Sequence, residues 1–232
     1  MDQQSAAQTA RRLVLLCQQG LSDRVTGWDK GLFSLCERAE AHGFELVYDG
    51  AYPAFGALDE GGAYAALFET LDTNEDGLVD AGDEPSSVYL VGFSWGGVNI
   101  NEIAYRLSAD PHTAPGYGGV AVMVLLDAYQ PFYADFDVPL SVHQTWSYRQ
   151  TKTQSDDCSH DISFGYGYRG LKPHHHPEAL GTCRDLDLER VDPGVGHCGV
   201  VNSAADAVFH NLTTRRSDPS WSKKAQPCPQ YE

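Results

Sequence analysis

Ser94 lies at the centre of the sequence Gly92-Phe93-Ser94-Trp95-Gly96, a pattern typical of a nucleophilic serine. A serine hydroxyl attacks a carbonyl carbon only when it is held away from its backbone and a base removes its proton. A sharp turn between a strand and a helix presents the hydroxyl in this way. Such a turn needs glycine two residues before and after the serine, because a Cβ there would clash. We therefore predict that Ser94 is the nucleophile of an acyl-transfer reaction.

A serine nucleophile needs a histidine as its base and a carboxylate that orients the histidine. We predict His197 as the base, since it lies in a glycine-rich stretch, residues 192–199, just before a helix that closes the domain. We predict Asp127 as the acid, because it directly follows an apolar strand expected beside the nucleophile strand. The alternatives for the acid are Asp156 and Asp157 and, less favoured, Asp135 and Asp137.

Acyl transfer also needs two N–H groups that stabilise the developing oxyanion. We predict that the backbone N–H of Trp95, directly after the nucleophile, is one of them. The second is expected from Leu21 or Gln19, in the loop that follows the first strand. The Trp95 ring would add an aromatic wall beside the substrate.

The segments around these residues alternate between strand and helix patterns. The strands are expected at residues 12–17, 44–48, 88–93, 120–126 and 138–146, and the helices at residues 28–42, 63–71, 98–108 and 200–212. Several strands are uniformly apolar, which predicts an α/β fold whose mostly parallel sheet is covered by helices on both faces. Residues 147–192 break this rhythm and are expected to form long loops or a small hairpin. The short stretch between Asp127 and the strand at 138–146 leaves no room for a large cap domain.

The order Ser94, Asp127, His197, together with the turn around Ser94 and the alternating pattern, resembles the α/β-hydrolase superfamily over residues 11–212. The position of Asp127 is similar to that of the acid in pancreatic-type lipases, and residues 141–150 and the late histidine loop resemble compact secreted bacterial hydrolases. The resemblance implies a Ser-His-Asp triad that hydrolyses carboxylic esters through an acyl-enzyme. The chain departs from lipases after the first strand, where Gln19 stands in place of their usual histidine.

Residues 72–83 form a second motif, which matches the calcium loop of EF-hands and resembles dockerin-like repeats. Oxygen-bearing side chains fall at positions 1, 3, 5 and 9, a glycine at 6 and an apolar residue at 8, and Leu78 would supply a backbone carbonyl. The predicted ligands are Asp72, Asn74, Asp76, Leu78, Asp80 and Asp83. Position 12 holds the shorter Asp83 in place of glutamate, and Glu84 is the alternative ligand. A strand follows the loop where an EF-hand has a second helix, so we expect a structural Ca²⁺ and no organic cofactor.

Composition limits the partners and the compartment. The formal charge is −16, with 32 acidic and 16 basic residues, so nucleic acid and anionic membranes would repel the chain. No apolar run is long enough to span a bilayer. The six cysteines are Cys17, Cys36, Cys158, Cys183, Cys198 and Cys228. They form no C-x-x-C pair, which argues against a zinc or thioredoxin-like site. Their even number favours disulfides and a secreted or periplasmic protein, although the sequence leaves their pairing open.

At 232 residues, the chain suits a single domain over residues 11–215. Residues 1–10 are expected to be a mobile leader and residues 216–232 a C-terminal tail. We expect a monomeric serine esterase that acts on a small or polymeric ester. Two alternatives stay open: a non-catalytic, calcium-stabilised binding module, and an acyltransferase or amidase that uses the same triad.

Overall fold

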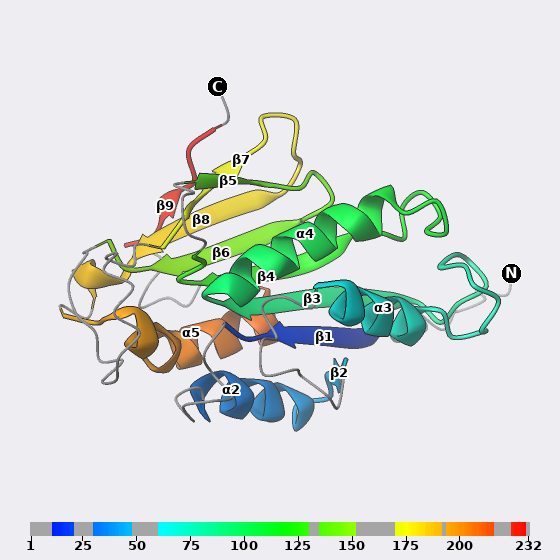
Figure 1. The fold of residues 1–232 in the computed structure, drawn as a ribbon, viewed down its shortest axis with the longest axis horizontal. Helices are drawn as coiled ribbons and strands as arrows, with labels where there is room; N and C mark the ends of the chain where they lie inside the picture. Colours follow the sequence, from blue (N-terminus) through cyan, green and yellow to red (C-terminus); the bar gives the residue numbers. More distant parts are fainter. Residues whose placement is uncertain are drawn as a thin grey trace, which may run out of the picture.

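A computed structural model describes residues 11–20, 30–47, 60–129, 135–151, 170–191, 194–215 and 224–230. A seven-stranded sheet forms its centre, in the order β2-β1-β3-β4-β6-β8-β9 (Figure 1). The strands are β1 (Arg12–Gln18), β2 (Glu45–Leu46), β3 (Ser86–Phe93), β4 (Val120–Leu126), β6 (Gln144–Arg149), β8 (Thr182–Asp187) and β9 (Gln226–Pro227). All neighbouring pairs are parallel except β8 and β9. The predicted α/β class with a mostly parallel sheet is confirmed.

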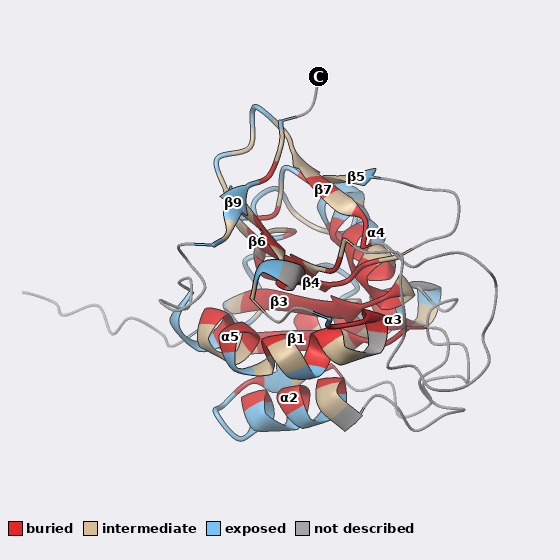
Figure 2. Ribbon diagram, turned by 90° about the vertical axis from the view of Figure 1, so that its left-hand side faces the viewer, coloured by how far each residue is buried: buried red, intermediate tan, exposed pale blue. Residues whose placement is uncertain are grey.

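Helices cover both faces of the sheet. The helices are α2 (Lys30–Glu40), α3 (Glu60–Leu71), α4 (Trp95–Ala109) and α5 (Val200–Thr214). Helices α2 and α5 pack on one face and α3 and α4 on the other (Figures 1 and 2). Alternate residues of β4 enter the two resulting cores, with Val124 on the α5 side and Met123 on the α4 side. The apolar sequence of β4 thus follows from burial on both faces.

The structure corrects the predicted strand at residues 138–146. Two strands occupy this region, β5 (Asp135–Val138) and β6, and Pro139 and the turn after it separate them. Strand β5 pairs in parallel with β7 (Lys172–His175) in a small second sheet. Of the predicted strand at 44–48, the described residues 44–47 contain the two residues of β2. The region 147–192, expected as loops or a hairpin, contributes β7 and β8, both in parallel pairs with earlier strands.

Within the described residues, disulfides join the sheet to its surroundings in two places. Cys17 at the end of β1 bonds Cys36 in α2, and Cys183 in β8 bonds Cys228 beside β9. Residues 226–228, which belong to the predicted tail, therefore lie along β8, and residues 229–230 lie beside β7. Two disulfides are compatible with the expected extracellular protein. Cys158, the side chain of Cys198 and the predicted leader at residues 1–10 lie outside the described part of the chain.

None of the helices in the described ranges is both long and apolar enough to cross a membrane.

Candidate active site

Ser94 sits in the sharp turn between β3 and α4, as its sequence context predicts. Its backbone has φ 55° and ψ −127°, a combination that few non-glycine residues adopt. Backbone hydrogen bonds impose this conformation, because Ser94 N donates to Leu126 O at 3.0 Å and Ser94 O accepts from the N–H groups of Gly97 and Tyr129. Strain of this kind typically costs about 1–3 kcal/mol and gathers at functional sites.

The glycines around Ser94 are required by close backbone packing. A Cβ on Gly92 would lie 2.4 Å from the carbonyl oxygen of Gly96. A Cβ on Gly96 would lie 2.3 Å from the carbonyl oxygen of Gln18, at the end of β1. Any larger residue at either position would thus push the turn out of place. The glycine spacing in the sequence therefore reflects a steric requirement that the structure bears out.

His197 contacts Ser94 directly. Its Nε2 lies 2.8 Å from Ser94 Oγ, across 103 residues of sequence. His197 begins a short 3-10 helix (His197–Gly199) that leads into α5, so the start of that helix holds its backbone. The rings of Phe93 and Tyr129 flank the imidazole, with centroids 4.9 and 6.1 Å from its own. Both Ser94 and His197 are buried.

Asp127 completes the cluster from the end of β4. Its Oδ2 lies 2.6 Å from His197 Nδ1, and its side chain is fully buried. The other carboxylate oxygen, Oδ1, accepts a hydrogen bond from the backbone N–H of Gln150 at 2.9 Å. An ionised carboxylate only accepts hydrogen bonds, so it favours the imidazole tautomer with a proton on Nδ1. In that tautomer Nε2 is an acceptor, so it can accept the hydrogen bond of the Ser94 hydroxyl.

The alternatives for the acid have other positions. Asp135 and Asp137 lie on β5, where Asp135 is 3.6 Å from His174. Asp156 and Asp157 lie outside the described residues. Among the described aspartates that we considered, Asp127 is the one in contact with His197.

The predicted oxyanion donors are placed in part. Trp95 is the first residue of α4, and the first N–H groups of a helix have no partner within it. Gln19 follows β1, and its backbone carbonyl packs against Gly96. Leu21 lies outside the described residues. The described part thus brings the end of β1 beside the turn at Ser94, the region from which the second donor is predicted.

Gln150 and Gly170 contribute to the site, although the sequence analysis did not identify them. Gln150 acts through its backbone N–H, which any residue except proline carries. A Cβ on Gly170 would lie only 2.2 Å from Asp127 Oδ1, so this position has no room for a side chain. Gln150 is the last residue of the segment 141–150 named above, but that resemblance does not point to its backbone N–H, and Gly170 belongs to no motif.

The predicted calcium loop connects α3 to β3. Gly77 has φ +82°, as the sharp turn requires, and Asp72 accepts hydrogen bonds from the N–H groups of Asp76 and Gly77. Partial burial of Asp83 acts to raise its pKa, but N–H donors of Asp80, Thr73 and Asn74 outweigh this and lower it. In the described residues, no three His, Cys, Asp or Glu side chains converge as a metal group. The predicted set includes an amide and a backbone carbonyl, hard oxygen donors that suit Ca²⁺.

No model of a known protein family matches the sequence, and no curated protein matches it. The functional argument therefore depends on the geometry of the site.

Proposed function

We propose that the protein is a serine hydrolase of the α/β-hydrolase type that cleaves carboxylic esters. The continuous hydrogen-bonded chain Ser94–His197–Asp127 carries this proposal, with Oγ–Nε2 and Nδ1–Oδ2 distances of 2.8 and 2.6 Å. Ser94 and Asp127 directly follow the parallel strands β3 and β4, and His197 lies in the segment between β8 and α5. Active sites commonly lie at the carboxyl ends of parallel strands. A hydroxyl, a base and an orienting carboxylate in this order match the chemistry of acyl transfer.

In the first half of the reaction, Ser94 Oγ attacks the ester carbonyl carbon while its proton moves to His197 Nε2. Asp127 stabilises the imidazolium that forms and keeps its own negative charge. The carbonyl oxygen becomes an oxyanion, for which the N–H of Trp95 and a donor after β1 are the proposed partners. The C–O bond of the ester then breaks, and His197 returns the proton to the departing alcohol.

In the second half, water replaces the alcohol. His197 Nε2 accepts a proton from water as the water oxygen attacks the acyl carbon, and the tetrahedral intermediate then expels Ser94 Oγ. The proton returns to Ser94, and a carboxylic acid is released. The same two residues thus act in both halves with their roles reversed.

A direct test compares the wild-type protein with Ser94→Ala on p-nitrophenyl esters and on matched anilides. We expect the wild type to hydrolyse the esters and the variant to lose activity by roughly four to six orders of magnitude. A fluorophosphonate probe should label the wild type, and peptide mapping should find the label on Ser94. Equal ester hydrolysis by both proteins would contradict the proposal, and faster cleavage of anilides would favour an amidase.

We further propose that residues 72–83 bind a structural Ca²⁺ and that the protein is exported. The ligand spacing and the positive φ of Gly77 support the first proposal, and the two disulfides support the second. Calcium would brace the connection between α3 and the nucleophile strand β3 and would take no part in the reaction. Extracellular loops of this type bind calcium at about 10⁻⁴–10⁻³ M, which suits an exported protein.

A further inference from the structure

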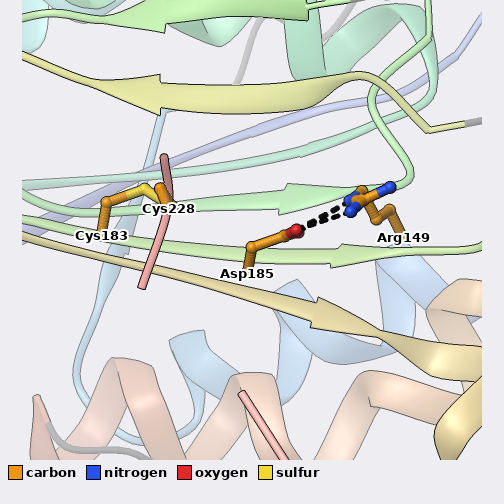
Figure 3. Close-up of a disulfide and its surroundings, with 4 residues drawn as sticks. All are labelled: Arg149, Cys183, Asp185 and Cys228. Carbon is orange, nitrogen blue, oxygen red and sulfur yellow. Dashed lines mark hydrogen bonds and ion pairs between the residues drawn. A yellow bond between two sulfur atoms is a disulfide. The ribbon is translucent and has the colours of Figure 1, made fainter. Parts of the chain in front are cut away.

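An ion pair joins β6 and β8, the two strands that come after β4 in the order of the sheet. It lies beside Asp127, the triad acid at the end of β4. Arg149, at the end of β6, donates from Nε to both carboxylate oxygens of Asp185 in β8 at 2.9 Å. Its Nη2 lies 2.8 Å from Asp185 Oδ2, and both side chains are largely buried, with 17% and 9% exposed. Figure 3 shows the two side chains reaching toward each other between the strands. A paired contact of this type fixes both the distance and the orientation of its partners.

The backbone on either side of Arg149 holds Asp127. The carbonyl of Tyr148 accepts the N–H of Asp127 at 2.6 Å, and the N–H of Gln150 donates to Asp127 Oδ1 at 2.9 Å. Gly170 packs tightly between Asp127 and Arg149. A Cβ added to Gly170 would lie 2.2 Å from Asp127 Oδ1 and 2.5 Å from Arg149 Cβ. A displacement of the end of β6 would therefore move the carboxylate that orients His197.

Strand β8 is itself anchored. The disulfide between Cys183 and Cys228, visible beside Asp185 in Figure 3, joins β8 to the segment of β9. Asp185 also pairs with Gln226 in the antiparallel ladder between these strands. The connection thus runs from the disulfide through β8 and the ion pair to the end of β6, and from there to Asp127.

We propose that Arg149 is a positioning residue of the triad, which holds the end of β6 through Asp185 and so fixes the Asp127 carboxylate against His197. The inference rests on the proposed serine hydrolase function. Arg149 keeps its charge in this setting. Burial alone would lower the pKa of its guanidinium, but the carboxylate of Asp185, followed by those of Asp187 and Asp127, outweighs burial and raises the pKa.

The test compares Arg149→Met and Arg149→Lys with the wild type. Misplacement of a catalytic group by about 1 Å can cost roughly 10²-fold in rate, so we expect Arg149→Met to lower kcat by about this factor. Lysine restores the charge without the paired geometry and should recover about tenfold of the loss. KM should stay within about twofold, because Arg149 acts through Asp127 and not on the substrate.

A matched control is available between β1 and β2, at the other end of the strand order. Arg12 in β1 makes the same type of paired contact with Glu45 in β2, at 2.6 and 3.0 Å. Arg12→Met should leave kcat within about twofold of the wild type. An Arg149→Met protein with wild-type kcat, or an equal loss in Arg12→Met, would overturn the inference.

A second measurement does not depend on ester turnover. The proton on His197 Nδ1, held by Asp127, should give a downfield proton resonance in the wild type and in Arg12→Met. This resonance should shift or broaden in Arg149→Met and return toward its wild-type position in Arg149→Lys.

If Ser94→Ala proves as active as the wild type while the resonance behaves in this way, the proposed function fails and the positioning role stands. An unchanged resonance in a folded Arg149→Met protein overturns the positioning role alone. Should Arg149→Met not fold, the resonance and kcat of Arg149→Lys decide, and wild-type values for both overturn it.

Discussion

The triad and the loop at residues 72–83 are both proposed functional sites, and they are built in opposite ways. The loop takes its six proposed ligands from twelve consecutive residues, and its hydrogen bonds are mostly within itself. The triad takes its three side chains from the ends of β3 and β4 and from the loop before α5. Its two key hydrogen bonds span 70 and 103 residues.

This difference separates local from global stabilisation. The loop geometry follows from a glycine and from carboxylates that cap nearby N–H groups, so short-range interactions account for most of it. The triad exists only when the parallel sheet has formed, since Ser94 and Asp127 follow two different strands and His197 lies just before α5. Damage to the sheet edge should therefore affect catalysis, and damage to the loop should affect stability.

The largest expected effect comes from Asp127→Asn. Asparagine keeps the size of the side chain but loses the charge that orients and stabilises the imidazolium, so kcat should fall by about 10⁴-fold. Steady-state ester hydrolysis measures the effect. Asp137→Asn and a combined Asp156→Asn and Asp157→Asn variant are the controls and should keep wild-type kcat. A loss in either control with retention in Asp127→Asn would show that another aspartate is the acid.

A smaller effect is expected from Gly170→Ala, which places a Cβ 2.2 Å from Asp127 Oδ1. The carboxylate must move, which should lower kcat by about 10²-fold and destabilise the fold by about 1–3 kcal/mol. Kinetics and thermal unfolding together measure both effects. The matched control is Gly61→Ala in α3, where the new Cβ meets nothing within 4 Å. Wild-type kcat in Gly170→Ala would show that the Asp127 carboxylate tolerates displacement.

Calcium removal should have the smallest effect on catalysis. Calcium at 100 times its Kd would stabilise the fold by about 2.7 kcal/mol, so chelation should lower Tm by roughly 5–10 °C. The value of kcat at 25 °C should stay within about twofold. Calorimetry with calcium or EDTA checks the shift, with Asp76→Ala expected to be insensitive. Glu75→Gln, at a position in the same loop with no predicted ligand, should respond like the wild type. No shift in the wild type would argue against a calcium site.

Much of the fold was predictable because its strands are buried on both faces. The run Val120–Leu126 has no polar residue, and the structure assigns a strand with the same bounds. The errors fell where burial is partial. The predicted strand at 138–146 divides into β5 and β6, and the alternation of residue types there did not reveal the turn after Pro139. Strand β8 was missed because its sequence, T-C-R-D-L-D, is too polar for a typical central strand.

The sequence by itself determined the turn around Ser94, since only glycine tolerates the close backbone contacts at positions 92 and 96. It also determined the alternation of strand and helix and the candidates for base and acid, because these depend on residue type and near neighbours. The tertiary structure alone decided that Asp127 contacts His197, that Gln150 and Gly170 shape its surroundings, and that Arg149 pairs with Asp185. Those contacts join residues far apart in the chain, and parallel pairing of β4, β6 and β8 brings them together.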